Sequence, residues 1–129
     1  MNATDTDGVG LGRRFVEAIV GHDWDALAAC FAADARLTAV VPKENAFRDR
    51  VGREAAAGQL KAWFGNADVT ELLDSDVESI ADRVRIVYRI REHEPDGWYL
   101  VEQVAYATVD DGGFSAMNLA CSGFRPLPG

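Results

Sequence analysis

The spacing of apolar positions divides the chain into a helical first half and a strand-forming second half. Over residues 11–20 the apolar side chains recur at helical spacing, with charged side chains on the opposite face. Asp23 is placed to cap a second helix whose apolar stripe ends at Phe31. A short β-type run follows at residues 36–41, and residues 52–64 predict a third helix.

After residue 68 the apolar period changes from near helical spacing to alternation, which is typical of strands. Polar and glycine-rich segments at 94–97 and 110–113 predict turns between consecutive strands. The expected strands lie at residues 69–80, 83–92, 98–109 and 114–124. Helices followed by strands predict an α+β fold, with three N-terminal helices packed on one face of an antiparallel sheet.

The 129 residues fit one domain. Residues 1–10 are rich in Asp, Thr and Gly without periodicity, so we expect a flexible lead followed by a single domain over residues 11–125. The first residues lack the basic and apolar regions of a signal peptide, and no apolar run is long enough to span a bilayer. The expected location is therefore the cytoplasm.

The charge balance narrows the classes of partner. The formal net charge is −8, which argues against nucleic-acid binding and against an anionic membrane surface. Cys30 and Cys121 lie in apolar surroundings and read as small buried side chains. His22 and His93 are isolated in the sequence, so the chain predicts no metal site and no cofactor.

Alternation assigns the faces of the strands. In residues 83–92 the inner face carries Val84, Ile86, Tyr88 and Ile90, because the alternate positions are mostly arginine. In the last strand the larger apolar set, which includes Met117 and Leu119, belongs inside.

The strand over residues 98–109 is assigned by matching large side chains to large neighbours. This places Leu100, Val104 and Tyr106 inward, and Glu102 lies on the same face. The assignment depends on the register of the turn that contains Pro95. A slip of one residue would turn Glu102 outward, into an exposed ion pair with Arg89.

Glu102 is the predicted catalytic residue, because a carboxylate on an apolar inner face has its charged form disfavoured and its pKa raised. Tyr88 and Tyr106 are the predicted hydrogen-bond donors beside it. The alternative is that Glu102 faces outward or is satisfied by an arginine. The predicted ligand-binding side chains are apolar: Phe15, Trp24, Trp63, Val104, Met117 and Leu119.

Three short runs resemble a known superfamily: residues 14–19 (RFVEAI), 23–27 (DWDAL) and 31–35 (FAADA). They are similar to the opening of nuclear transport factor 2-like proteins, which include SnoaL-like polyketide cyclases and ketosteroid isomerases. The resemblance implies a cone-shaped α+β barrel in which a strongly curved sheet encloses an apolar cavity, and it implies a homodimer. The superfamily includes isomerases, cyclases, dehydratases, epoxide hydrolases and binding domains without catalysis.

The residues expected of a ketosteroid isomerase are not matched. The general-base position falls on Ala39, the oxyanion-hole tyrosine on Phe15, and the second acid near Val104. Two hypotheses follow. The first is an acid/base isomerase, cyclase or dehydratase that acts on a hydrophobic carbonyl or polyketide-like compound. The second is a small-molecule-binding or dimerisation module without catalysis, which the apolar residues at these positions favour.

Overall fold

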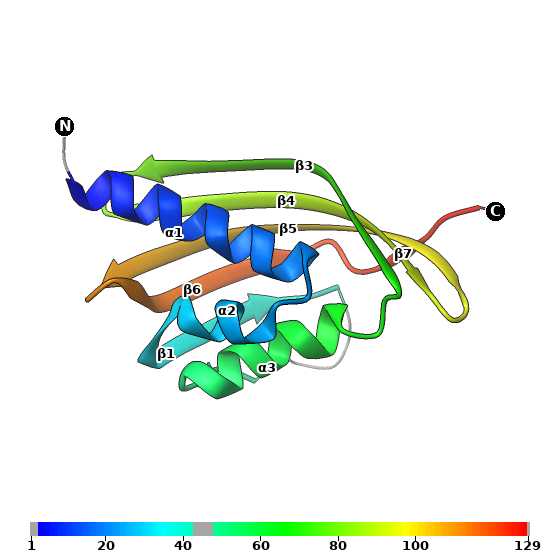
Figure 1. Cartoon of the computed structure of the whole chain (residues 1–129), viewed down its shortest axis with the longest axis horizontal. Coiled ribbons are helices and arrows are strands. Elements are labelled where there is room, and N and C mark those ends of the chain that lie inside the picture. The colour runs from blue at the N-terminus through cyan, green and yellow to red at the C-terminus, as the bar shows by residue number, and fades with distance from the viewer. Residues whose placement is uncertain (1–2, 43–47, 129) are drawn as a thin grey trace.

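The computed structural model describes residues 3–42 and 48–128. These ranges contain helices α1 (Ala3–Val20), α2 (Trp24–Ala29) and α3 (Arg53–Phe64), and strands β1 (Phe31–Val40), β2 (Arg50–Val51), β3 (Val69–Ile80), β4 (Arg83–Glu94), β5 (Gly97–Asp110), β6 (Gly113–Cys121) and β7 (Arg125–Pro126) (Figure 1). The predicted α+β class is confirmed. No helix in these two ranges is long and apolar enough to cross a membrane.

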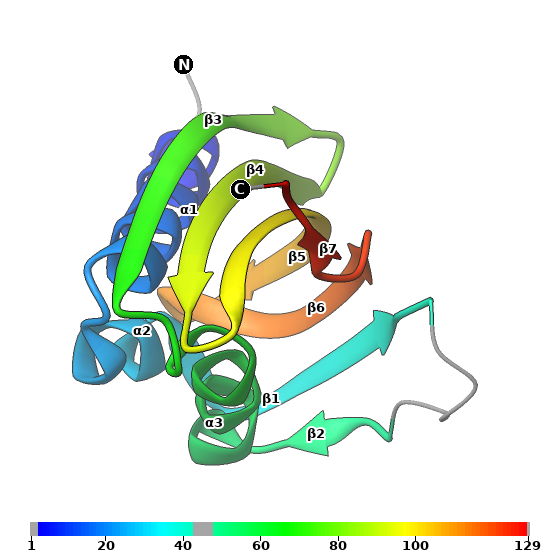
Figure 2. The same ribbon diagram turned by 90° about the vertical axis from the view of Figure 1, so that its right-hand side faces the viewer.

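The strands form one mixed sheet in the order β2-β1-β6-β5-β4-β3, and β7 pairs with β5. All neighbours are antiparallel except β1 and β6, which run parallel. An antiparallel sheet was predicted, and the observed sheet is mixed. The difference arises because β1, from the helical half of the chain, joins the sheet beside β6 and runs parallel to it. The three helices lie on one side of the sheet, as Figure 2 shows.

Two helix boundaries differ from the prediction. α1 begins at Ala3 rather than at residue 11, so most of the expected lead is helical. α2 ends at Ala29, and Phe31 opens β1 instead of completing a helical stripe. Tertiary packing overrides local propensity at both places, since the sheet supports α1 and pairs β1.

α1 lies directly on the sheet because glycine removes the side chain at the contact. A Cβ atom at Gly12 would lie 2.6 Å from Val77 Cγ1 and 3.3 Å from Ile86 Cγ1. A Cβ atom at Gly8 would lie 2.7 Å from Val84 Cγ2. Real side chains do not approach this closely, so the two glycines set the distance between α1 and strands β3 and β4.

An aromatic cluster joins α1 to strands β1, β4 and β6. The Phe15 ring is fully buried and meets the rings of Phe31, Tyr88 and Phe114 edge to face. The centroid distances from Phe15 are 6.1, 5.9 and 5.9 Å respectively, which is the preferred range for aromatic pairs. Phe15 is therefore a central packing residue.

The turn between β4 and β5 decides which face of β5 is buried. Glu94 pairs with Gly97, so only Pro95 and Asp96 lie in the loop. This pairing places Ala105 opposite Ile86, and the buried face of β5 consists of Val101, Gln103, Ala105 and Ala107. The prediction that Leu100, Glu102, Val104 and Tyr106 face inward is wrong. The small side chains of Ala105 and Ala107 lie between larger buried side chains of the neighbouring strands, such as Ile86 and Met117.

Candidate functional site

Glu102 lies on the outer face of the sheet. Its Oε2 is 3.1 Å from Arg89 Nη2, and 43% of its side chain is exposed. Exposed pairs of this kind contribute at most about 1 kcal/mol. The desolvation on which its predicted catalytic role depended is absent. Val104 and Tyr106 lie on the same outer face, where Tyr106 is 38% exposed, so they do not join an inner site.

Tyr88 faces inward as predicted, and it is engaged by the protein itself. Its hydroxyl donates to Gln103 Oε1 at 2.5 Å, and Gln103 Nε2 donates to Cys121 Sγ at 3.3 Å. Burial holds the pKa of Tyr88 well above its ordinary value, so the phenol stays neutral. These three side chains form a buried polar network whose partners lie within the sheet.

The predicted ligand-binding side chains do not converge on one place. Phe15, Met117 and Leu119 are buried in the core. Trp24 is half-buried and lines a groove between α2 and α3, whereas Trp63 is half-buried and packs against the core. The sequence could not separate these roles, because aromatic residues at helical spacing fit a core and a pocket equally well.

Glu92 is the carboxylate that the structure buries, and sequence reasoning missed it. It continues the alternation of Ile86, Tyr88 and Ile90 on the inner face of β4, and it is 0% exposed. Neither carboxyl oxygen has a hydrogen-bond partner in the described part of the chain. Extending the inner alternation of β4 by one step would have found it.

The environment of Glu92 disfavours its charge. Burial, and next the neighbouring carboxyl of Glu94, raise the pKa of Glu92 from 4.5 to about 9. Glu94 lies two residues further along the same strand and is half-buried. At neutral pH Glu92 therefore carries its proton, and a neutral carboxyl can donate one hydrogen bond and accept others.

The polar neighbours of Glu92 bond elsewhere. Glu92 pairs across the sheet with Thr70 on β3 and with Tyr99 on β5, and both are half-buried. Thr70 Oγ1 is hydrogen-bonded to Nε2 of His22 at 2.9 Å. The Tyr99 hydroxyl donates to Asp96 Oδ2 at 2.7 Å. Toward the β4–β5 hairpin, Glu92 is therefore surrounded by half-buried residues.

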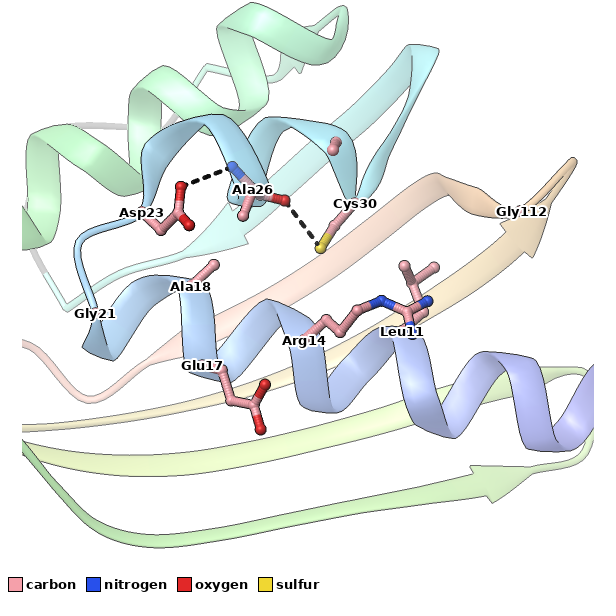
Figure 3. Close-up of a pocket in the computed structure, with 10 residues that line it drawn as sticks. Leu11, Arg14, Glu17, Ala18, Gly21, Asp23, Ala26, Cys30 and Gly112 are labelled. Carbon is pink, nitrogen blue, oxygen red and sulfur yellow. Dashed lines mark hydrogen bonds between the residues drawn. The ribbon is translucent and has the colours of Figure 1, made fainter.

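A separate groove of about 560 Å³ lies between α1 and α2. Figure 3 shows Arg14 and Ala18 on α1 along one side of the groove and Asp23 and Cys30 on the other. The thiol of Cys30 donates to the Ala26 carbonyl oxygen at 3.4 Å, and burial raises its pKa to about 11. A thiol held neutral in this way is a poor nucleophile, so this groove lacks reactive chemistry of its own.

Metal-binding side chains are not gathered in the described ranges. Within residues 3–42 and 48–128, no group of three or more His, Cys, Asp and Glu side chains could hold a metal ion. Nδ1 of His93 lies 2.8 Å from Asp68 Oδ1 on the outer face, far along the chain from His22. Among the described residues, Glu92 is thus the one buried carboxyl whose oxygens have no hydrogen-bond partner.

Three helices on one side of a mixed sheet, in this order, define a protein of the nuclear transport factor 2-like fold. The family model of the SnoaL-like domain matches residues 12–117, and the chain belongs to this family. A comparison with the curated proteins finds no match.

Several solved structures share the fold at low sequence identity. A protein from Xanthomonas campestris pv. campestris, proposed to be a polyketide cyclase, is 23% identical, with a TM-score of 0.72 over 90% of each chain. An LEH-like epoxide hydrolase from M. tuberculosis is 15% identical, with a TM-score of 0.69 over 92% of this chain and 85% of that one. A ketosteroid isomerase-like protein from Catenulispora acidiphila, solved with trimethylamine, is 16% identical, with a TM-score of 0.69 over 87% and 85%. At these identities the likeness establishes the fold alone.

Proposed function

We propose that this SnoaL-like protein binds an apolar small molecule at the inner face beside Glu92 and performs acid/base chemistry at its carbonyl group. The observation that carries the proposal is the fully buried Glu92 carboxyl with two unpartnered oxygens. Burying such a group without a partner costs stability, and native folds keep few of them. A group that weakens the fold and lies among half-buried residues is best explained by a ligand.

The chemistry follows from the two carboxyls on the end of β4. Neutral Glu92 donates a hydrogen bond to the carbonyl oxygen, which stabilises the negative charge that develops there when a proton leaves the adjacent carbon. Glu94 is the carboxylate placed to accept that proton. Returning the proton to another carbon gives an isomerisation, and attack of the enolate on a second carbonyl gives a cyclisation.

The relatives support a small-molecule ligand. One is proposed to be a polyketide cyclase, one is an epoxide hydrolase, and one was solved with a small amine. A carbonyl compound of polyketide-like size is the substrate class that also suits a neutral acid.

The test compares two identical substitutions on opposite faces of the sheet. Glu92→Gln removes the acidic proton, and we expect turnover of a panel of cyclic ketones and aromatic polyketides to fall about 100-fold or more. Glu102→Gln alters an exposed carboxylate in an ion pair with Arg89, and we expect turnover to stay at the wild-type level. Unchanged turnover in a folded Glu92→Gln protein would rule out the catalytic role.

The second candidate function is binding without catalysis. The specific observation in its favour is that the general-base and oxyanion-hole positions implied by the ketosteroid isomerases carry Ala39 and Phe15. Both side chains are buried and apolar in the structure. Ligands from the same panel that raise the melting temperature without being converted would support this reading.

We also propose that the outer face of the sheet pairs with a second copy of the chain. Ion pairs between neighbouring strands, such as Arg91 with Glu71 and Arg89 with Glu102, keep this face level and mixed in charge. Exposed Tyr106 and Val40 add apolar area to it. The substrate-facing side of the sheet is left free by such an arrangement.

A further inference from the structure

The unsatisfied groups of Glu92 specify the shape of the hydrogen-bonding partner. A neutral carboxyl has one O–H donor on one oxygen and a carbonyl acceptor on the other. Both Oε1 and Oε2 are buried and unpartnered in the described part of the chain. A simple ketone would accept from the O–H group and leave the carbonyl oxygen of Glu92 unsatisfied. To satisfy both oxygens of Glu92, a ligand must present one hydrogen-bond acceptor and one donor side by side.

The neighbouring side chains do not supply that pair. The hydroxyl of Thr70 is bonded to His22, and the hydroxyl of Tyr99 donates to Asp96. Further along the inner face, Gln103 is bonded to both Tyr88 and Cys121. Apart from the Glu94 carboxyl, whose proximity helps to raise the pKa of Glu92, the polar groups on this part of the inner face are thus already hydrogen-bonded. Among the described residues, none meets the geometry of a hydrogen bond to either Glu92 oxygen.

The charge beside Glu92 restricts the ligand further. Glu94 lies on the same face, and in the described ranges no ion pair joins it to a cation. Its negative charge repels an anion, so a ligand with a carboxylate head is disfavoured although it would offer acceptors. A neutral head group that offers a donor and an acceptor fits both the carboxyl and the local charge.

Building on the function proposed above, we propose that the ligand pairs edge to edge with Glu92 through a carbonyl oxygen flanked by an N–H or O–H donor. Lactams carry such an edge, because their cis amide presents C=O and N–H side by side. The ligand carbonyl accepts from the Glu92 O–H group, and the ligand donor reaches the other Glu92 oxygen. Two hydrogen bonds then close a cyclic pair in a site from which water is excluded.

The test uses two probes that differ only in the substituent on the ring nitrogen. 2-Quinolone presents a carbonyl and an N–H side by side, whereas N-methyl-2-quinolone keeps the apolar rings and the carbonyl but lacks the donor. Dissociation constants are measured by calorimetry at neutral pH. We expect the full-length protein to bind 2-quinolone about tenfold or more tightly than the N-methyl compound, because the missing donor leaves a buried oxygen unsatisfied.

Two variants assign the preference to Glu92. Glu92→Gln still offers one donor and one acceptor, so it should keep the preference for 2-quinolone. Glu92→Met is similar in size without either group and should bind the two probes alike. Thermal unfolding of both variants verifies that the fold is retained, and Glu102→Met serves as the outer-face control and should keep the wild-type preference.

The outcomes separate this inference from the proposed function. If wild type binds the two probes equally and Glu92→Met weakens both, the paired-edge geometry is overturned while Glu92 remains a ligand-binding acid. If neither of the two quinolones binds and no ketone of the panel binds, both the paired-edge inference and the proposed function are wrong.

Discussion

Glu92 ties the stability of the fold to pH. Its pKa rises from 4.5 to about 9 on folding, because of burial and then of Glu94. The folded chain therefore holds a proton that the unfolded chain has already lost between these two values. The stabilisation is fully present below the lower value and is lost as the pH rises through the upper one.

A stability series across this window tests the protonation of Glu92. The free energy of unfolding of wild type should fall relative to Glu92→Gln with a slope of up to about 1.4 kcal/mol per pH unit. Denaturant titrations from about pH 5 to about pH 9 give this difference, and Glu102→Gln should follow wild type. Parallel curves for wild type and Glu92→Gln would show that the buried carboxyl does not hold its proton.

At the residue scale, the prediction that Glu102 faces inward is wrong. The buried carboxyl on the inner face is Glu92 rather than Glu102. The inner face of β4 was predicted correctly through Ile90, and Glu92 is the next member of that series. The sequence neighbours of Glu92 are polar, whereas Glu102 was selected because apolar residues flank it.

Among the elements, α1 depends on the two glycines that face the sheet. Gly12→Ala adds a methyl group 2.6 Å from Val77 Cγ1, so we expect a loss of about 1–3 kcal/mol in stability. Gly58→Ala in α3 is the matched control, since nothing lies within 4 Å of its added Cβ. That change should stabilise by about 0.5–1 kcal/mol, because alanine is the better helix former.

Urea denaturation of both glycine variants measures these changes. Opposite signs are expected, although the substitution and the helical context are the same. A stabilised Gly12→Ala protein would show that α1 does not lie as closely on β3 and β4 as described. Binding of ligand near Glu92 should be unchanged in Gly58→Ala, which lies on the solvent side of α3.

The elements themselves were mostly predictable, and their register was not. Alternation found β3, β4, β5 and β6 to within a few residues, and periodicity with capping residues found the helices. The face of β5 is set by the number of residues in the turn after Glu94, and a match of large to large side chains could not supply it. Ala105 and Ala107 are inside, between larger buried side chains of β4 and β6, and only the assembled fold shows this.

For the whole molecule, the proposed pairing of two copies through the outer face predicts that a charged substitution on that face converts the dimer into monomers. Tyr106→Asp places a charge in the proposed contact, so sedimentation velocity should show monomers where wild type shows dimers. Ala55→Asp puts the same charge on an exposed position of α3 and should remain dimeric. A monomeric wild type, or a dimeric Tyr106→Asp protein, would remove this face as the interface.

The parallel pairing of β1 with β6 also sets when the domain can form during synthesis. Phe31 pairs with Phe114, so β1 completes its hydrogen bonds only with a strand that lies far along the chain. Contacts of such long sequence separation slow folding, and an unpaired strand invites association with other chains meanwhile. Nascent chains that stop before β6 therefore leave one edge of β1 unpaired although β2 is already present, and the native sheet can assemble only after β6 has been synthesised.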